Sequence, residues 1–257
     1  MVGGERYALN TMDVTYWGPS GWQLFHLIAE GSPTPLRTLA HLSSILPCKY
    51  CRESTANYTA DHPLTKGMNA GKWLFEIHNR VNHKLTTQSE TDPKVILPEP
   101  NPTYEDVHHK YAELLKHAPH NVPGRDFLFS IAYNYPNKPE LDDVNTQQVF
   151  LKSLAVTYPF PELRKIVALY LRTHPINLKS RNTYLHWMYG LLHQLSVKTN
   201  SPIRSFKGYT HHVAYYKAGC NKPTYHGKTC RRLGDGSYTK QRDHKRTRRI
   251  AVGGLLA

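Results

Sequence analysis

The chain has 257 residues, of which 39% are hydrophobic, and carries a net charge of +14 at neutral pH. This length allows one large domain or two modest ones, and the apolar fraction is sufficient for a packed core. No segment approaches the run of about 18 apolar residues that a membrane-spanning helix needs, and the first residues lack the apolar stretch of a signal peptide. The sequence therefore argues against a membrane or secreted protein and predicts a soluble one on the cytosolic side of membranes.

Helical periodicity dominates the first 92 residues. Apolar side chains recur there at intervals of three or four, and a Trp-Gly-Pro-Ser turn and Pro47 mark helix boundaries. A compact helical bundle is expected from residue 1 to 92. Its four predicted helices are Tyr16–Ala29, Pro35–Leu46, Cys48–Thr59 and Lys72–Leu85.

A second helical region follows a proline-rich stretch. Prolines crowd residues 93–102, which predicts a linker. The helical pattern resumes from 103 to 199 and predicts a second all-α domain. Its expected helices are an apolar stripe from Tyr104 to Leu115, then Asp126–Asn134, Val144–Thr157, Pro161–Thr173 and Lys179–Lys198. Residues 200–257 lack a sustained period and are expected to form a largely irregular tail. The predicted fold class is all-α.

The positive charge is concentrated in this tail. Residues 200–257 hold 13 Lys or Arg against Asp235 and Asp243, so they carry +11 of the net +14. A basic segment of this kind indicates a polyanion or an acidic protein surface as partner. Interleaved tyrosines also suit phosphate contact with base stacking, and a solvated end without a partner is the simplest alternative. The densest candidate binding residues are Arg242, Lys245, Arg246, Arg248 and Arg249.

Cys48 and Cys51 form a C-x-x-C motif. In an intracellular protein this spacing indicates a redox pair or half of a zinc site. The predicted helix begins at the pair, and unpaired N–H groups at a helix N-terminus stabilise a thiolate. Lys49 and Arg52 add positive charge nearby. A thiolate of low pKa is what disulfide exchange requires, so the surroundings favour the redox interpretation.

Three motifs occur in one order along the first third of the chain. They are Trp17-Gly18-x-x-Gly21-Trp22-x-x-Phe25-His26-x-x-Ala29, then Leu46-Pro47-Cys48-x-x-Cys51, then Trp73-Leu74-x-x-x-His78-Asn79-x-Val81-Asn82-x-x-Leu85. Together they resemble the Erv/ALR family of FAD-linked sulfhydryl oxidases. The likeness covers roughly residues 12–90, and the two-domain layout looks most like the versions of large cytoplasmic DNA viruses.

This resemblance implies a helical bundle that holds FAD without covalent attachment and without a Gly-rich dinucleotide turn. It further implies that Cys48 and Cys51 are catalytic, with Cys51 beside the flavin ring and Cys48 facing the client thiol. Electrons would pass from client proteins through the pair and FAD to oxygen, giving hydrogen peroxide. Lys84 and Lys94 are candidate diphosphate partners on charge grounds alone. The implied cofactor-binding residues are Trp17, Trp22, His26, Trp73, His78, Asn79, Asn82 and Lys84.

The tail cysteines Cys220 and Cys230 admit three interpretations. They could shuttle electrons to the C-x-x-C pair, staple the tail or stay unpaired, or form a metal site with nearby histidines, although their spacing is unlike common zinc modules. No metal site is predicted. A homodimer is expected, located in the virion or host cytoplasm if the protein is viral and otherwise on the cytosolic side of membranes. Two alternatives to an oxidase are a structural virion protein, such as a minor capsid protein, and a zinc-bound nucleic-acid binder.

Overall fold

The computed structural model describes residues 11–90 and 102–218, which are mainly helical. The fold is all-α, as predicted, with one short two-stranded ladder. In chain order the elements are β1 (Thr11–Met12), α1 (Val14–Gly31), α2 (Leu36–Leu39), α3 (Leu42–Ile45), α4 (Lys49–Asp61), α5 (Ala70–Ser89), α6 (Tyr104–Lys116), α7 (Arg125–Asn134), α8 (Leu141–Thr157), α9 (Pro161–Thr173), α10 (Arg181–Lys198), α11 (Phe206–Ala214) and β2 (Lys217–Ala218).

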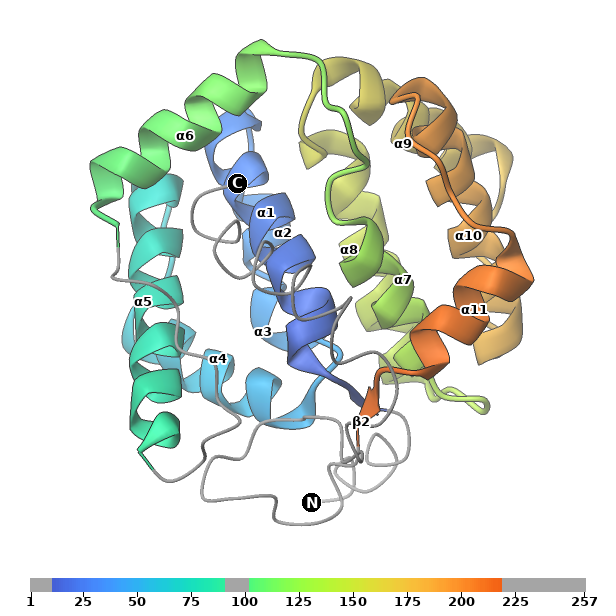
Figure 1. Cartoon of the computed structure of the whole chain (residues 1–257), viewed down its shortest axis with the longest axis horizontal. Coiled ribbons are helices and arrows are strands. Elements are labelled where there is room, and N and C mark those ends of the chain that lie inside the picture. Colours follow the sequence, from blue (N-terminus) through green and yellow to red (C-terminus); the bar gives the residue numbers. More distant parts are fainter. Residues whose placement is uncertain (1–10, 91–101, 219–257) are drawn as a thin grey trace, which may run out of the picture.

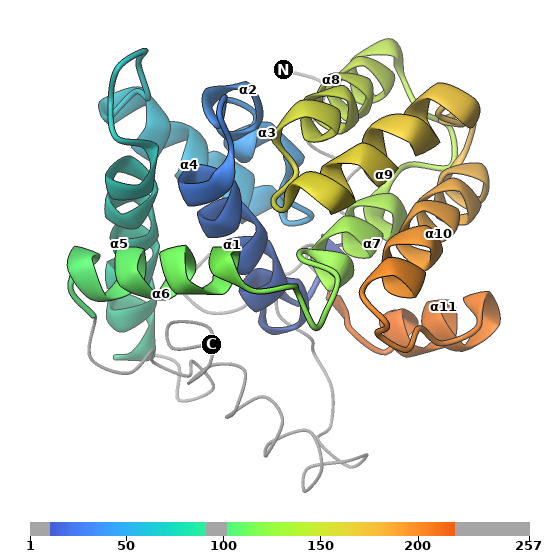
Figure 2. The ribbon, with the colours of Figure 1, turned by 90° about the horizontal axis from the view of Figure 1, so that it is seen from above.

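Helix α1 lies in the middle of the structure. Figures 1 and 2 show α4, α5 and α6 on one side of it and α7 to α11 on the other. Asp13 caps its start, with a side-chain oxygen that accepts a hydrogen bond from the Thr15 amide at 2.9 Å. Such a cap satisfies an amide that the helix itself leaves unpaired. Apolar residues are buried on several sides of α1, which therefore contacts helices of both halves of the chain.

The contact between α1 and α7 is a cluster of aromatic rings around a glycine. Phe127 of α7 is fully buried, and its ring meets that of Phe25 edge to face at a centroid distance of 5.2 Å. Trp17 lies 5.9 Å from the same ring. A Cβ atom at Gly21 would sit 3.1 Å from Phe127, closer than real Cβ contacts usually come. The absence of a side chain at Gly21 thus lets α7 approach α1 closely.

The segment predicted as one helix over Pro35–Leu46 is instead two short helices, α2 and α3. The chain leaves helical geometry at His41, where φ is −98° and ψ is 2°. Leu39, Leu42 and Ile45 are all buried on either side of the break. Apolar spacing therefore continues through the break, which is why periodicity did not reveal it.

A buried group of hydroxyls joins α2 to α8. The Thr38 hydroxyl is hydrogen bonded to those of Ser153, at 2.7 Å, and Thr157. Ser153 and Thr157 also donate to carbonyl oxygens of their own helix. All three side chains are buried, and each has a partner, as buried polar groups require.

Helix α6 packs against α1 and α5. A capping box at Thr103 and Asp106 starts it, and Val107 and Tyr111 form its buried face. The helices expected between 103 and 199 are present, with α9 at the predicted bounds Pro161–Thr173. Most of the proposed linker lies outside the described residues, and the division into two domains stays a prediction.

Order extends into the region predicted as an irregular tail. Helix α11 begins after Ser205, whose hydroxyl accepts a hydrogen bond from the Gly208 amide. Tyr209 and Val213 are buried from this helix. Beyond it, β2 pairs with β1 in antiparallel register, Thr11 opposite Ala218 and Met12 opposite Lys217. Residues 206–214 therefore form a helix, stabilised by buried aromatic contacts, within a segment predicted to be largely irregular.

Candidate active site

Cys48 and Cys51 form a disulfide at the N-terminus of α4. Cys48 is the N-cap residue with extended backbone, and its sulfur accepts a hydrogen bond from the Cys51 amide at 3.1 Å. Side-chain acceptors at an N-cap satisfy amides that the first turn leaves unpaired. The same N–H group and the helix dipole would stabilise a thiolate after reduction. The predicted position of the pair at a helix start is confirmed.

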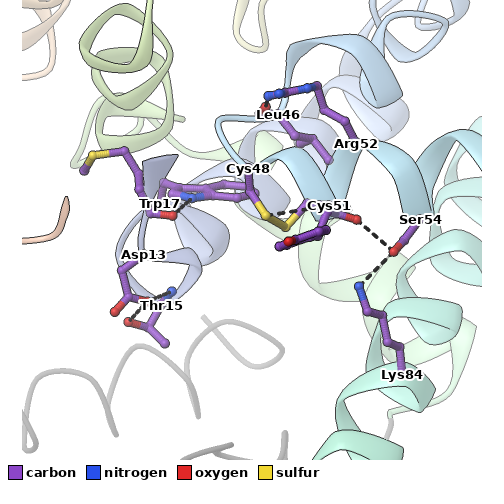
Figure 3. The surroundings of a disulfide bond; sticks show 11 residues. Asp13, Thr15, Trp17, Leu46, Cys48, Cys51, Arg52, Ser54 and Lys84 are labelled. Atoms are coloured by element: carbon purple, nitrogen blue, oxygen red, sulfur yellow. Dashed lines mark hydrogen bonds between the residues drawn. A yellow bond between two sulfur atoms is a disulfide. The ribbon is translucent and has the colours of Figure 1, made fainter. Parts of the chain in front are cut away.

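The two cysteines differ in exposure. Cys48 is completely buried, whereas Cys51 is partly buried. Figure 3 shows the indole of Trp17 beside Cys48. The indole nitrogen of Trp17 donates to the carbonyl of Met12 at 3.3 Å, and the Met12 amide donates to the carbonyl of Pro47 at 3.3 Å. Trp17, predicted to contact the cofactor, thus lies beside the disulfide.

The basic residues next to the pair make local contacts. The Arg52 guanidinium donates to the carbonyl of Leu46 at 2.6 Å, so it closes the turn that precedes Cys48 (Figure 3). The Lys49 ammonium lies 4.0 Å from the Glu53 carboxylate. Both cations remain within the first turns of α4, where their charge also favours a thiolate.

A buried histidine pair links α1 to α5. Nε2 of His26 lies 3.2 Å from Nδ1 of His78. Trp22 stacks on His78 with ring centroids 3.8 Å apart, and Tyr111 of α6 stacks on His26 at 4.8 Å. Three residues predicted from two separate motifs, Trp22 and His26 from the first and His78 from the third, therefore come together, and Tyr111 joins them from outside those motifs.

Burial controls the charge of this cluster. It lowers the pKa of His78 to about 3 and that of His26 well below its usual value. The neighbouring His78 and the ammonium of Lys110 lower the pKa of His26 further. Both imidazoles are therefore neutral at physiological pH. Burial also lowers the pKa of Lys110 to about 8.

Two buried polar atoms beside the histidine pair have no hydrogen-bond partner within residues 11–90 and 102–218. They are Nδ1 of His26 and the ammonium nitrogen of Lys110. A buried polar atom without a partner is costly in a folded protein. These two atoms therefore mark a place where a polar ligand would be stabilised.

The remaining predicted residues have different surroundings. Asn82 is buried one turn after His78 on α5, so the two share a helix face, while Asn79 is partly buried. The Trp73 indole nitrogen donates to the carbonyl of His62 at 2.8 Å, which ties α5 to the end of α4. The Lys84 ammonium donates to the Ser54 hydroxyl at 2.8 Å (Figure 3). Lys94, Cys220, Cys230 and the basic cluster from Arg242 to Arg249 lie outside the described residues.

Lys110 was not predicted from the motifs, although the sequence carries a signal for it. It follows Val107 by three residues and precedes Leu114 by four, so it falls on the apolar face of α6. A charged residue on such a face is unusual and indicates either a buried partner or a ligand. The apolar stripe from Tyr104 to Leu115 predicts the helix but assigns no role to the lysine within it.

Residues 11–90 and 102–218 contain no group of three or more His, Cys, Asp or Glu side chains that could hold a metal ion. None of the helices in these ranges combines the length and apolarity needed to cross a membrane.

Comparison with known proteins places these features in one family. The Erv1/Alr family model matches residues 19–98. A probable FAD-linked sulfhydryl oxidase of Acanthamoeba polyphaga mimivirus is 32% identical over 99 residues, which cover 33% of this chain and 69% of that protein.

The chain belongs to the Erv1/Alr family.

Two yeast members are also similar. An FAD-linked sulfhydryl oxidase of Schizosaccharomyces pombe is 32% identical over 82 residues, covering 32% of this chain and 43% of that protein. A mitochondrial FAD-linked sulfhydryl oxidase of Saccharomyces cerevisiae is 29% identical over 97 residues, covering 33% of this chain and 51% of that protein. No solved structure matches the chain significantly. The Erv1/Alr match includes the disulfide and the histidine pair but ends before α6, which carries Lys110 and Tyr111.

Proposed function

We propose that this protein is an FAD-dependent thiol oxidase that introduces disulfides into client proteins. The observation that carries the proposal is the Cys48–Cys51 disulfide at the N-terminus of α4 in an Erv1/Alr chain. The named function of the three relatives supports it, since each is an FAD-linked sulfhydryl oxidase.

The residues of the histidine cluster fit a polar aromatic cofactor. Trp22 and Tyr111 stack on the two histidines, and Nδ1 of His26 and the Lys110 ammonium are buried beside them without a hydrogen-bond partner among the described residues. We assign Trp22, His26, His78, Asn82 and Lys110 to FAD binding. Tyr111 would complete this set from α6. When bound, FAD supplies the two-electron chemistry that reoxidises the dithiol and reduces oxygen to hydrogen peroxide.

The chain's own cysteines perform the thiol exchange. A client thiolate attacks the Cys48 sulfur, the Cys48–Cys51 bond breaks, and Cys51 leaves as a thiolate in the first turn of α4. A second client thiolate then attacks the client sulfur of the mixed disulfide, and Cys48 leaves as a thiolate. The client loses two electrons and gains a disulfide, while the Cys48–Cys51 pair is reduced. The Cys51 amide, which contacts the Cys48 sulfur, stabilises that leaving thiolate.

The proposal is tested by absorption spectra and oxygen uptake of the purified protein with a small dithiol as substrate. We expect flavin bands near ~450 nm and oxygen consumption that is lost in Cys51→Ser. The matched control is the Cys220→Ser/Cys230→Ser double variant, which makes the same chemical change outside the pair. It should retain activity toward the small dithiol. A colourless protein that cannot be reconstituted with FAD would disprove the oxidase function.

The finer aspects of the proposal concern the tail and the setting. If Cys220 and Cys230 shuttle electrons, their double variant should lose activity toward protein clients and keep it toward the small dithiol. If they form a staple or a metal site, no selective loss toward protein clients is expected. Similarity to a mimivirus protein supports a setting in a virion or viral factory. We also propose a homodimer and a tail that contacts nucleic acid or other virion proteins. No feature of the described structure favours the minor capsid alternative.

A further inference from the structure

The Cys48 sulfur is inaccessible in the folded chain. Disulfide exchange requires a thiolate to reach the attacked sulfur, yet Cys48 has no exposed surface. Cys51 is partly exposed by comparison. If the client attacks Cys48, as the proposed function holds, some segment that covers this residue must first move away.

Strand β1 and the start of α1 provide that cover. Met12 is fully buried, and its amide donates to the carbonyl of Pro47, the residue before Cys48. Its own carbonyl accepts the indole N–H of Trp17, whose ring lies beside Cys48 in Figure 3. The backbone of Met12 is thus hydrogen bonded to the residue before the cysteine that a client would attack, and the indole of Trp17 is drawn next to that cysteine in Figure 3.

Residues far along the chain hold β1 in this position. Strand β2 pairs with β1, and the Asp13 amide donates to the carbonyl of Tyr216 at 2.9 Å. The ring of Tyr216 stacks on that of Tyr16 with centroids 4.3 Å apart. The cover is therefore fastened by a segment that lies about 120 residues beyond the part of the chain matched by the family model.

Helix α11 is held more firmly on α7 than β2 is held on β1. Tyr209 of α11 is buried, stacks on Phe129 at 4.1 Å and donates to the Asp126 carboxylate at 2.8 Å. The ladder itself contains two residues in each strand, and two-stranded pairings of this kind are marginally stable alone. Opening at the ladder therefore costs less free energy than releasing α11 from α7.

We propose that the β1–β2 ladder is a cap over Cys48, which opens to admit client thiols while α11 stays anchored. Local opening of weakly held segments is a general property of folded proteins. The apparent reactivity of Cys48 then equals its intrinsic reactivity multiplied by the open fraction. The C-terminal part of the described chain thus sets how readily a client thiolate reaches the Cys48–Cys51 disulfide.

The test measures alkylation of each cysteine in the reduced holoprotein. The protein with bound cofactor is reduced with excess dithiothreitol without oxygen, the reductant is removed, and iodoacetamide is added. Mass spectrometry of peptides gives separate rates for Cys48 and Cys51. The variants are Tyr216→Ala, which removes the ring stacked on Tyr16, and Ala218→Pro, which opposes strand pairing. The control is Tyr104→Ala, which removes a partly buried tyrosine from α6.

We expect both cap variants to raise the Cys48 rate about tenfold, as a tenfold larger open fraction requires, and to leave the Cys51 rate nearly unchanged. Tyr104→Ala should match the wild type. Equal Cys48 rates in the wild type and both variants would overturn the proposal, as would a client mixed disulfide formed on Cys51. Circular dichroism identifies a variant that fails to fold. If either Tyr216→Ala or Ala218→Pro does so, the Cys48 rate of the other variant tests the proposal. Because alkylation needs no turnover, a failure of the oxidase function would leave this result interpretable.

Discussion

His26 and His78 contact each other through Nε2 and Nδ1 at 3.2 Å, and both rings are buried. Two neutral imidazoles can share one such hydrogen bond, with one ring donating and the other accepting. Whichever ring donates, Nδ1 of His26 keeps a donor or an acceptor without a protein partner. The pair therefore joins α1 to α5 and at the same time presents one polar atom toward a ligand.

The same pair makes stability depend on pH. Burial lowers the pKa of both histidines in the folded protein, that of His78 to about 3, so the unfolded chain binds more protons below pH 6.5. Stability is therefore complete above the unfolded pKa and falls with pH below it. Lowering the pH from 6.5 to 5 should cost up to about 2 kcal/mol for each histidine. Urea unfolding across this range measures the loss.

The variant His78→Gln should flatten the pH profile, since one of the two titrating groups is gone. His186→Gln, which replaces an exposed histidine on α10, serves as the control and should keep the slope. A wild-type profile without any slope between pH 5 and 6.5 would contradict the buried neutral pair.

Lys110→Met should separate cofactor binding from folding. Without a ligand, the substitution removes a buried ammonium that has no hydrogen-bond partner in the described part of the chain and lies over the Tyr111 ring at 5.3 Å, so the melting temperature should rise. FAD affinity should fall about tenfold, because one charge-assisted hydrogen bond is lost. Titration of the apoprotein followed by flavin fluorescence measures the second effect. The control is Lys116→Met on the exposed end of the same helix, and an unchanged affinity in Lys110→Met would exclude this lysine from the FAD site.

Phe127→Ala should be among the most destabilising single substitutions. The ring is fully buried against Phe25 and Trp17, and its removal leaves a cavity between α1 and α7. A loss of about 3–5 kcal/mol in the free energy of unfolding is expected. Chemical denaturation measures it. Leu141→Ala, at a residue that is 74% exposed, should change stability by less than about 0.5 kcal/mol.

Thr38→Val probes the hydroxyl group between α2 and α8. The replacement keeps the shape but leaves Ser153 and Thr157 without their shared partner, although both retain a bond to their own helix. We expect a loss of about 1–3 kcal/mol. Combined with Thr157→Val, the double variant should lose less than the sum of the single losses. Strict additivity in this cycle would show that the two hydroxyls do not interact.

Much of the helical framework could be predicted because each helix carries its own periodicity and boundary signals. Pro161 marks the start of α9, and the apolar spacing of α5 identifies its buried face. The order of the motifs also predicted that His26 and His78 serve one site. These features depend on residues close together in sequence, which pattern analysis detects directly.

Other features depend on contacts between distant segments. The pairing of Met12 with Lys217 and the hydrogen bond from Met12 to Pro47 join segments that local periodicity cannot relate. The expected client-facing role of Cys48 stays a prediction for this reason. Tyr209 shows the same difficulty, since its anchoring depends on Phe129 and Asp126, about 80 residues earlier.

Helix α1 packs against both groups of helices, α5 and α6 on one side and α7 on the other. A fragment that ended with the family match at residue 98 would retain Phe25 but lose Phe127, and so expose an aromatic surface to water. Such a fragment would be prone to aggregate rather than fold as an autonomous unit. Heating the intact protein should accordingly give one cooperative calorimetric transition, in which both groups of helices melt together.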